Sequence, residues 1–347
     1  MNFASDNTAP VAPAILDAIV QANTGYAMGY GNDDWTNGVE RQLSELFERD
    51  VAVFLVPTGT AANALSLAQV TPPWGVVFCH QDAHIVTDEC GAPEFFGDGL
   101  KLDGLPGDGA KITPETLKSA LACYGGHEPH QMVASTLSIT QASEAGTIYR
   151  TDEIAELCEI AHTRNLAVHM DGARFANALV RLNTTPAQMT WRSGIDVLSF
   201  GATKGGALAA EAVVVFDPAR ASFLGERRKR AGHLLSKHRF IAAQMAAYLA
   251  EGRWLALARH ARVAFVPQGD QAGAQLAYYK VMVPACQHVM KSGPDKYHGR
   301  CVALLRHATT AAVADAAEIL PPPDDFACND DRDDSNDPTA QVTACSD

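Results

Sequence analysis

A lysine lies among small residues in the segment 199–206, SFGATKGG. Lys204 follows a run of apolar residues, as expected near the end of a buried strand, where open α/β sheets bind ligands. A lysine amine can form a Schiff base with a pyridoxal cofactor, and Gly201, Gly205 and Gly206 would leave room for the ring and the phosphate. The alternative is a surface lysine whose stem covers apolar side chains. The segment alone leaves both interpretations open.

An aspartate and an arginine follow another apolar run, in the segment 169–175, HMDGARF. Asp171 lies 33 positions before Lys204. A carboxylate at a strand end can pair with the pyridine nitrogen and keep it protonated, which preserves the ring as an electron sink. Arg174 presents a planar fork that suits a carboxylate. The alternative for Asp171 is a cap on the next helix.

The segment 57–63, PTGTAAN, follows the apolar run VAVFLV and opens a helical pattern. The first N–H groups of a helix have no partner within the helix, and together with the helix dipole they attract anions. Thr58, Gly59 and Thr60 are therefore candidates for holding the cofactor phosphate. Turns of this kind are common, so this segment supports a phosphate site only in combination with the other candidate segments.

A histidine follows the apolar run GVVFC, in the segment 80–96, HQDAHIVTDECGAPEFF. The imidazole of His84 could stack on a cofactor ring and exchange protons with a substrate, although a lone histidine can also be structural. Acidic neighbours, among them Glu89, also allow a metal interpretation. We predict no metal site, because His80 and His84 lie in a loop rather than on one helix face.

The elements that must position these residues alternate between short β-rich runs and helical patterns. This alternation predicts an α/β fold, with a mostly parallel sheet and helices on both of its faces. Predicted strands cover 51–56, 75–79, 132–139, 166–170, 196–200 and 211–216. Predicted helices cover 12–23, 39–49, 60–69, 113–122, 152–164 (with Thr151 as N-cap) and a long segment 236–262.

Composition indicates a globular chain of 347 residues, 47% hydrophobic and 19% charged. No apolar stretch of about 18 residues appears, and MNFASDNTAP lacks the pattern of a secretory signal, so we expect no membrane span. Eight cysteines without a CxxC pair fit reduced thiols and a cytoplasmic location. The net charge of −13 includes −7 from residue 320 onward, which leaves −6 before it and no indication of nucleic-acid binding.

Over about residues 1–260 the chain resembles the low-specificity L-threonine aldolases, pyridoxal 5'-phosphate enzymes of fold type I. The segments that carry this resemblance are FASDN (3–7), YGNDDWT (30–36), PTGTAAN (57–63), AHIVTDECGAPEFF (83–96), SITQASEAGTIY (138–149), HMDGARFANA (169–178) and GIDVLSFGATKGG (194–206), with RRKRAGHLLSKHRF (227–240) matching less sharply.

The resemblance implies roles for the residues already singled out. Lys204 matches the lysine that binds the cofactor covalently, and Asp171 matches the partner of the pyridine nitrogen. His84 matches the histidine that stacks on the ring, whereas Gly59 and Thr60 match the phosphate turn.

The resemblance also implies substrate contacts. Ser5 and Arg174 match residues that hold the carboxylate of the amino-acid substrate. A second active-site histidine is expected shortly before the segment SITQ. His130 fits by spacing better than His127, and the segment HEPH leaves this choice open.

The remaining implications concern assembly and reaction. Tyr30 matches a tyrosine that reaches a neighbouring subunit's site, and Arg230 would contact the phosphate across that interface, so a homo-oligomer, either tetramer or dimer, is implied. The implied reaction is retro-aldol cleavage of L-threonine or L-allo-threonine to glycine and an aldehyde. The alternatives are another fold-type-I β-eliminating lyase and a non-catalytic protein that still binds the cofactor.

The end of the chain departs from the family. We expect a cofactor-binding large domain over 1–262, an atypical C-terminal region over 263–319 and an acidic, disordered tail over 320–347. The family's C-terminal domain supplies a further arginine for the substrate carboxylate. Neither Arg300 nor Arg306 lies in a matching context, so that role stays unassigned.

Overall fold

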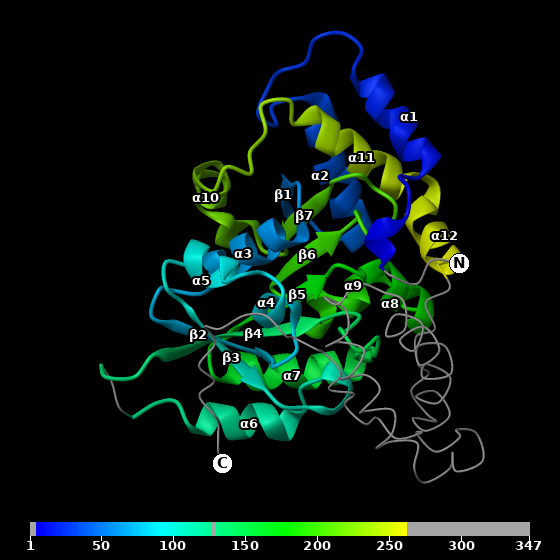
Figure 1. Ribbon diagram of the computed structural model, residues 1–347. Coiled ribbons are helices and arrows are strands. Elements are labelled where there is room, and N and C mark those ends of the chain that lie inside the picture. The colour runs from blue at the N-terminus through cyan, green and yellow to red at the C-terminus, as the bar shows by residue number, and fades with distance from the viewer. Residues whose placement is uncertain (1–4, 127–128, 262–347) are drawn as a thin grey trace, which may run out of the picture. The chain divides into compact units, whose positions relative to one another are not determined.

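The computed structural model describes residues 5–126 and 129–261, which form the α/β fold that the sequence predicts (Figure 1). The predicted regions 263–319 and 320–347 lie outside the described residues. None of the helices in the described ranges is long and apolar enough to cross a membrane.

The centre of the fold is a seven-stranded sheet in the order β1-β7-β6-β5-β4-β2-β3. Strand β7 runs antiparallel to both of its neighbours, and the other pairs are parallel. The six predicted strands are confirmed, with ends that differ by no more than two residues. The strands are β1 (Ala52–Val56), β2 (Gly75–His80), β3 (Lys101–Leu105), β4 (Val133–Thr140), β5 (Ala167–Gly172), β6 (Val197–Gly201) and β7 (Glu211–Val215).

The pattern in the sequence missed strand β3. Within the residues that the structure describes, β3 pairs with β2 alone, at the edge of the sheet. Its residues, KLDGL, alternate too weakly between apolar and polar types, and a charged residue and a glycine interrupt them. Edge strands are often short and carry charged side chains, which discourage pairing with another chain, and β3 fits this description.

Helices cover both faces of this sheet. The predicted ones are confirmed as α1 (Pro13–Ala22), α2 (Asp34–Phe47), α3 (Gly59–Val70), α6 (Pro114–Ala122) and α7 (Thr151–Thr163). Helix α2 begins earlier than predicted, because the Asp33 carboxylate accepts the Thr36 N–H at 2.9 Å and caps it. The sequence missed α4 (His84–Thr87), α5 (Ala92–Phe96), α8 (Phe175–Leu182), α9 (Pro186–Met189) and α10 (Leu224–Arg230).

Two details of the helix prediction were wrong. The segment 236–262 is not one helix but two, α11 (Arg239–Leu249) and α12 (Arg253–His260). The backbone turns between them, where Glu251 and Gly252 have φ of 57° and 66°. Thr151 is the first residue of α7 rather than its cap. The cap is Arg150, whose backbone N–H donates to the Glu153 carboxylate at 2.7 Å.

The central strands are buried on both faces of the sheet, as the side chains of β7 illustrate. Val213 and Val215 belong to a cluster with residues of α3, whereas Ala212 and Val214 point into the main core with α2 and α11. Because successive side chains of a strand point to opposite faces, α3 covers one face and α2 and α11 cover the other. The carboxyl ends of the parallel strands remain as one shared edge of the sheet, where helix α3 also begins.

Candidate active site

The shared edge of the sheet gathers the four predicted segments. The turn 57–60 follows β1, His84 follows β2, Asp171 lies near the end of β5, and Lys204 follows β6. Because β1, β2, β5 and β6 run in the same direction, their carboxyl ends lie at one edge. Segments that are far apart in the sequence therefore come together, as their positions at the ends of predicted strands indicate.

Asp171 is buried, with 4% of its surface exposed. Its Oδ2 accepts a hydrogen bond from Nδ2 of Asn63 at 2.8 Å, and its Oδ1 accepts one from the backbone N–H of Ala173 at 2.9 Å. These two hydrogen bonds hold the Asp171 carboxylate in a fixed orientation at the sheet edge.

Asn63 connects the side chain of Asp171 to a second buried carboxylate. Its Nδ2 also donates to Oε1 of Glu89 at 2.8 Å, and both residues are almost fully buried. The motifs of the sequence did not indicate this role for Asn63. The one indication in the sequence is its place in α3, where an amide side chain lies within the run TAANALSLA of hydroxyl-bearing, small and apolar residues.

His84 completes the group. Its Nδ1 lies 2.8 Å from Oε1 of Glu89, and the imidazole is 36% exposed. Because an ionised carboxylate can only accept, Nδ1 carries the hydrogen, and Nε2 is left for other partners. The hydrogen bond to Glu89 raises the pKa of His84, although partial burial and the charge of Lys204 oppose this. The backbone N–H of His84 donates to the carboxylate of Glu144 at 2.8 Å.

Lys204 lies half-buried in the turn 203–206. The glycines around it serve packing more than the sequence suggested. A Cβ at Gly205 would lie 2.3 Å from the Tyr248 hydroxyl oxygen, and one at Gly201 would lie 2.7 Å from Cα of Ala173. These glycines let the backbone approach the protein's own neighbouring groups, instead of clearing space for a ligand.

The turn before α3 is open, as an anion site requires. Thr58 caps the helix, with its Oγ1 accepting the Ala61 N–H at 3.1 Å. A Cβ at Gly59 would meet nothing within 4 Å. The first N–H groups of α3, including those of Gly59 and Thr60, have no partner within the helix. An anion can therefore approach this end of α3.

Arg174 already binds a carboxylate. Its Nε and Nη2 donate to Oδ2 and Oδ1 of Asp6 at 2.8 and 3.1 Å. Ser5, next in the chain, caps the short turn Asp6–Thr8, with its Oγ accepting the Asn7 N–H at 3.2 Å. The structure thus brings the segment of Ser5 to Arg174. The contact itself is made by Asp6, a residue that the motifs of the sequence did not single out.

The comparison with known proteins fits this geometry. The family model described as Beta-eliminating lyase matches residues 2–293. The chain belongs to that family. It is 43% identical over 260 residues to the low specificity L-threonine aldolase of a Pseudomonas sp. The aligned region covers 75% of this chain and 74% of the relative. It is 42% identical to the Pseudomonas aeruginosa protein of the same description, with the same coverage.

Solved structures agree. The threonine aldolase of Leishmania major superposes on this chain with a TM-score of 0.70 at 26% identity, covering 82% of this chain and 79% of that one. The predicted resemblance to threonine aldolases and the predicted fold type I are both confirmed.

The structure does not bring every predicted residue to the group around Lys204. His130 is exposed and precedes the amino end of β4, so it lies toward the opposite edge of the sheet. His127 is outside the described residues. Tyr30 is 50% exposed, and its ring lies 4.5 Å from Nζ of Lys229.

Among the basic residues of α10, the predicted Arg230 is exposed at the end of the helix. Arg228 is the one that reaches the sheet edge. Its Nη1 donates to the carbonyl oxygen of Leu55 at 3.1 Å, immediately before the end of β1, and burial lowers its pKa to about 10. The segment RRKR contains nothing that distinguishes these arginines, since the direction in which each points depends on how α10 packs.

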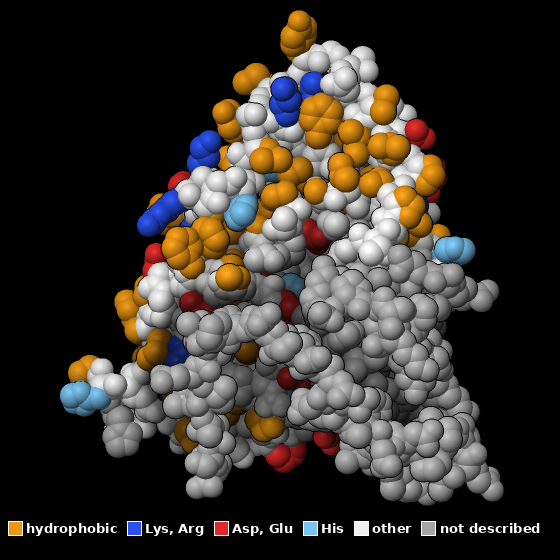
Figure 2. All heavy atoms as spheres, in the orientation of Figure 1, with side chains coloured by type: hydrophobic (Ala, Val, Ile, Leu, Met, Phe, Trp, Pro, Cys, Tyr) orange, Lys and Arg blue, Asp and Glu red, His pale blue; other side chains and the backbone are white. Residues whose placement is uncertain are grey.

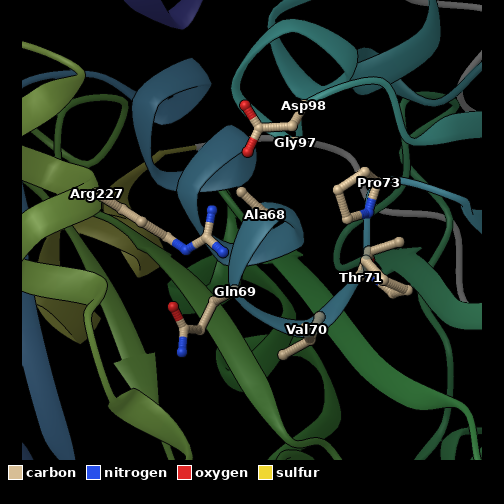
Figure 3. A pocket seen from close by; sticks show the side chains of 9 residues that line it. Ala68, Gln69, Val70, Thr71, Pro73, Gly97, Asp98 and Arg227 are labelled. Carbon is tan, nitrogen blue, oxygen red and sulfur yellow. The ribbon is translucent and has the colours of Figure 1, made fainter.

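A cavity of about 400 Å³ lies at the other end of α3 (Figure 3). Arg227 points into it from α10, and Asp98 lies across from the guanidinium. Its lining is formed by Ala68, Gln69, Val70, Thr71, Pro72, Pro73, Gly97, Asp98 and Arg227, and contains none of the predicted site residues. The cavity is therefore separate from the candidate active site.

Proposed function

We propose that this chain is a pyridoxal 5'-phosphate-dependent aldolase that cleaves L-threonine and L-allo-threonine to glycine and an aldehyde. The observation that carries the proposal is the convergence of Lys204, Asp171 and His84 at one sheet edge. The relationship to threonine aldolases at 43% and 42% identity supports it.

The residues at the sheet edge fit this cofactor. The buried carboxylate of Asp171 suits the pyridine nitrogen, and the open turn at Gly59 and Thr60 suits the phosphate. Lys204 would hold the cofactor covalently, and the half-exposed imidazole of His84 would lie against the ring. When bound, the cofactor supplies an electron sink for the pair of electrons left on Cα as the Cα–Cβ bond breaks.

His84 is the proposed base. Glu89 fixes the Nδ1 hydrogen of its imidazole, so Nε2 can take the proton of the β-hydroxyl, directly or through a water that it positions. Arg174 and Ser5 would hold the substrate carboxylate, with Asp6 sharing the guanidinium fork. Orientation by these contacts is what the protein adds to the chemistry of the cofactor.

We further propose a homo-oligomer, either a tetramer or a dimer, in which Tyr30 and Arg230 would meet a neighbouring subunit. Exposed hydrophobic side chains support this. Leu16 and Val20 on α1 and Tyr26 and Met28 after it are 51–107% exposed, and Figure 2 shows hydrophobic side chains gathered over the part of the surface that includes α1 and α11. Large exposed apolar patches mark interaction sites. A cytoplasmic location stays a prediction of the sequence.

The test combines a visible spectrum with a threonine-cleavage assay on the same sample. The full-length protein should take up pyridoxal 5'-phosphate, absorb in the visible and form glycine, and Lys204→Ala should abolish both colour and activity. A colourless protein that takes up no added cofactor would refute the proposal. Pyruvate and ammonia as products would indicate a β-eliminating enzyme, and colour without any product would indicate a non-catalytic relative.

A further inference from the structure

Glu211 lies at the shared edge of the sheet, between the turn 57–60 and the Lys204 turn, although no motif in the sequence singles it out. It is the first residue of β7, the antiparallel strand between β1 and β6. It pairs with Val56 at the end of β1 and with Gly201 at the end of β6. Its neighbours therefore lead directly into the turn 57–60 on one side and the Lys204 turn on the other.

The carboxylate of Glu211 holds the backbone that leads to Lys204. Oε2 accepts the N–H of Ala202 at 3.2 Å, and Oε1 accepts the N–H of Thr203 at 3.3 Å. The Thr203 hydroxyl also hydrogen-bonds this carboxyl and accepts the N–H of Ala210 at 3.2 Å. The two residues immediately before Lys204 are thus tied to one side chain.

A different side chain holds the far half of the same loop. Gln244 on α11 is buried, and its Oε1 accepts the N–H groups of Leu208 and Ala209, each at 3.0 Å. Gln244 is neutral and contacts the loop after Lys204, whereas Glu211 is ionisable and contacts it before Lys204. This difference provides a matched control.

We propose that Glu211 is a positioning residue whose carboxylate orients Lys204 for reaction with the cofactor, through the backbone N–H groups of Ala202 and Thr203. The inference rests on the proposed function, because it concerns the lysine that would bind the cofactor. Glutamate suits this position, because both carboxylate oxygens accept. The amide of a glutamine would present an NH₂ group to one of the two N–H donors.

The ionisation of Glu211 gives this role a pH dependence. Burial raises the pKa of the carboxyl to about 7, whereas the hydrogen bonds and the charge of Lys204 favour the anion. Tyr248 on α11 is the other titratable group in the described chain that interacts with it, and burial raises the pKa of this phenol. Below about pH 7 the protonated carboxyl has one oxygen fewer to accept with, so Lys204 should be held less well.

The experiment compares the full-length wild-type chain with Glu211→Gln and Gln244→Ala. Pyridoxal 5'-phosphate is added to cofactor-free protein, the bond to Lys204 is fixed with borohydride, and the labelled peptide is quantified by mass spectrometry over pH 5.5–9. We expect Glu211→Gln to lower the labelling rate about tenfold above pH 8, the effect of one lost charge-assisted hydrogen bond. The difference should shrink to about twofold below pH 6, whereas the ratio for Gln244→Ala should not depend on pH.

Hydrogen exchange of the same cofactor-free proteins gives a second measurement. The N–H groups of Ala202 and Thr203 should exchange faster in Glu211→Gln, and those of Leu208 and Ala209 in Gln244→Ala. If wild-type Lys204 takes up no cofactor, the proposed function fails, and the exchange rates still decide whether Glu211 holds the turn. Unchanged protection at Ala202 and Thr203, or a pH-independent labelling ratio for Glu211→Gln, would overturn the inference.

Discussion

Replacing Asn63 with alanine removes one amide that serves two buried carboxylates. In the native structure Nδ2 of Asn63 donates to Glu89 and to Asp171, each at 2.8 Å. A hydrogen bond to a charged group contributes about 1.5–3 kcal/mol, and each carboxylate would lose one donor. Because a single amide makes both bonds and water can enter the vacated space, we expect Asn63→Ala to lower the free energy of unfolding by about 3 kcal/mol.

A matched control lies one turn further along the same helix. Ser66 is equally buried, and its hydroxyl lies 3.3 Å from that of Ser199, a contact between neutral groups. Ser66→Ala should therefore cost about 1 kcal/mol. The assay is urea unfolding of the full-length variants, followed by far-UV circular dichroism and tryptophan fluorescence. A loss for Asn63→Ala no larger than that for Ser66→Ala would refute the idea that Asn63 stabilises two buried charges.

Two more predictions follow from the site. Glu89→Gln should lower the pKa of His84, because the carboxylate is the main group that raises it. The acidic limb of the kcat/KM profile should then move to lower pH. In the wild type, protonated His84 contributes stability that is present below about pH 6.5 and is lost as pH rises through the native pKa. This contribution should disappear in Glu89→Gln. An unshifted limb would contradict this. Gly205→Ala should cost about 1–3 kcal/mol in thermal unfolding, because its Cβ would lie 2.3 Å from the Tyr248 hydroxyl oxygen. Gly59→Ala, with nothing within 4 Å, is the control and should cost little, so equal losses would argue against the packing explanation.

Part of the site could be predicted because it depends on local sequence. Lys204, Asp171 and the turn 57–60 each follow an apolar run that forms a buried strand, and parallel strands place their carboxyl ends together. His84 could be predicted for the same reason, since it follows β2. The ends of the six predicted strands agree to within two residues, because buried strands in this sheet read as continuous apolar runs.

Other features depended on packing that no short segment contains. Helices α11 and α12 are separated by a turn at Glu251 and Gly252, although the sequence 236–262 reads as one helix. Spacing along the chain matched His130 to an active-site histidine, yet this residue precedes the amino end of β4 and lies toward the edge of the sheet opposite to that of Lys204. The direction in which a strand runs decides which edge of the sheet a preceding residue occupies, and the parallel pairing of β4 with β2 and β5 fixes that direction.

The sequence by itself determined which residue types stand at the strand ends of this chain, and therefore the chemistry available there. Only the tertiary structure decided which side chains hold them. Asn63 contacts partners 26 and 108 positions away, and Arg174 contacts Asp6 across 168 positions. Such pairs form when strand order, register and helix packing bring distant segments within 3 Å of each other, and local propensity carries no information about that distance.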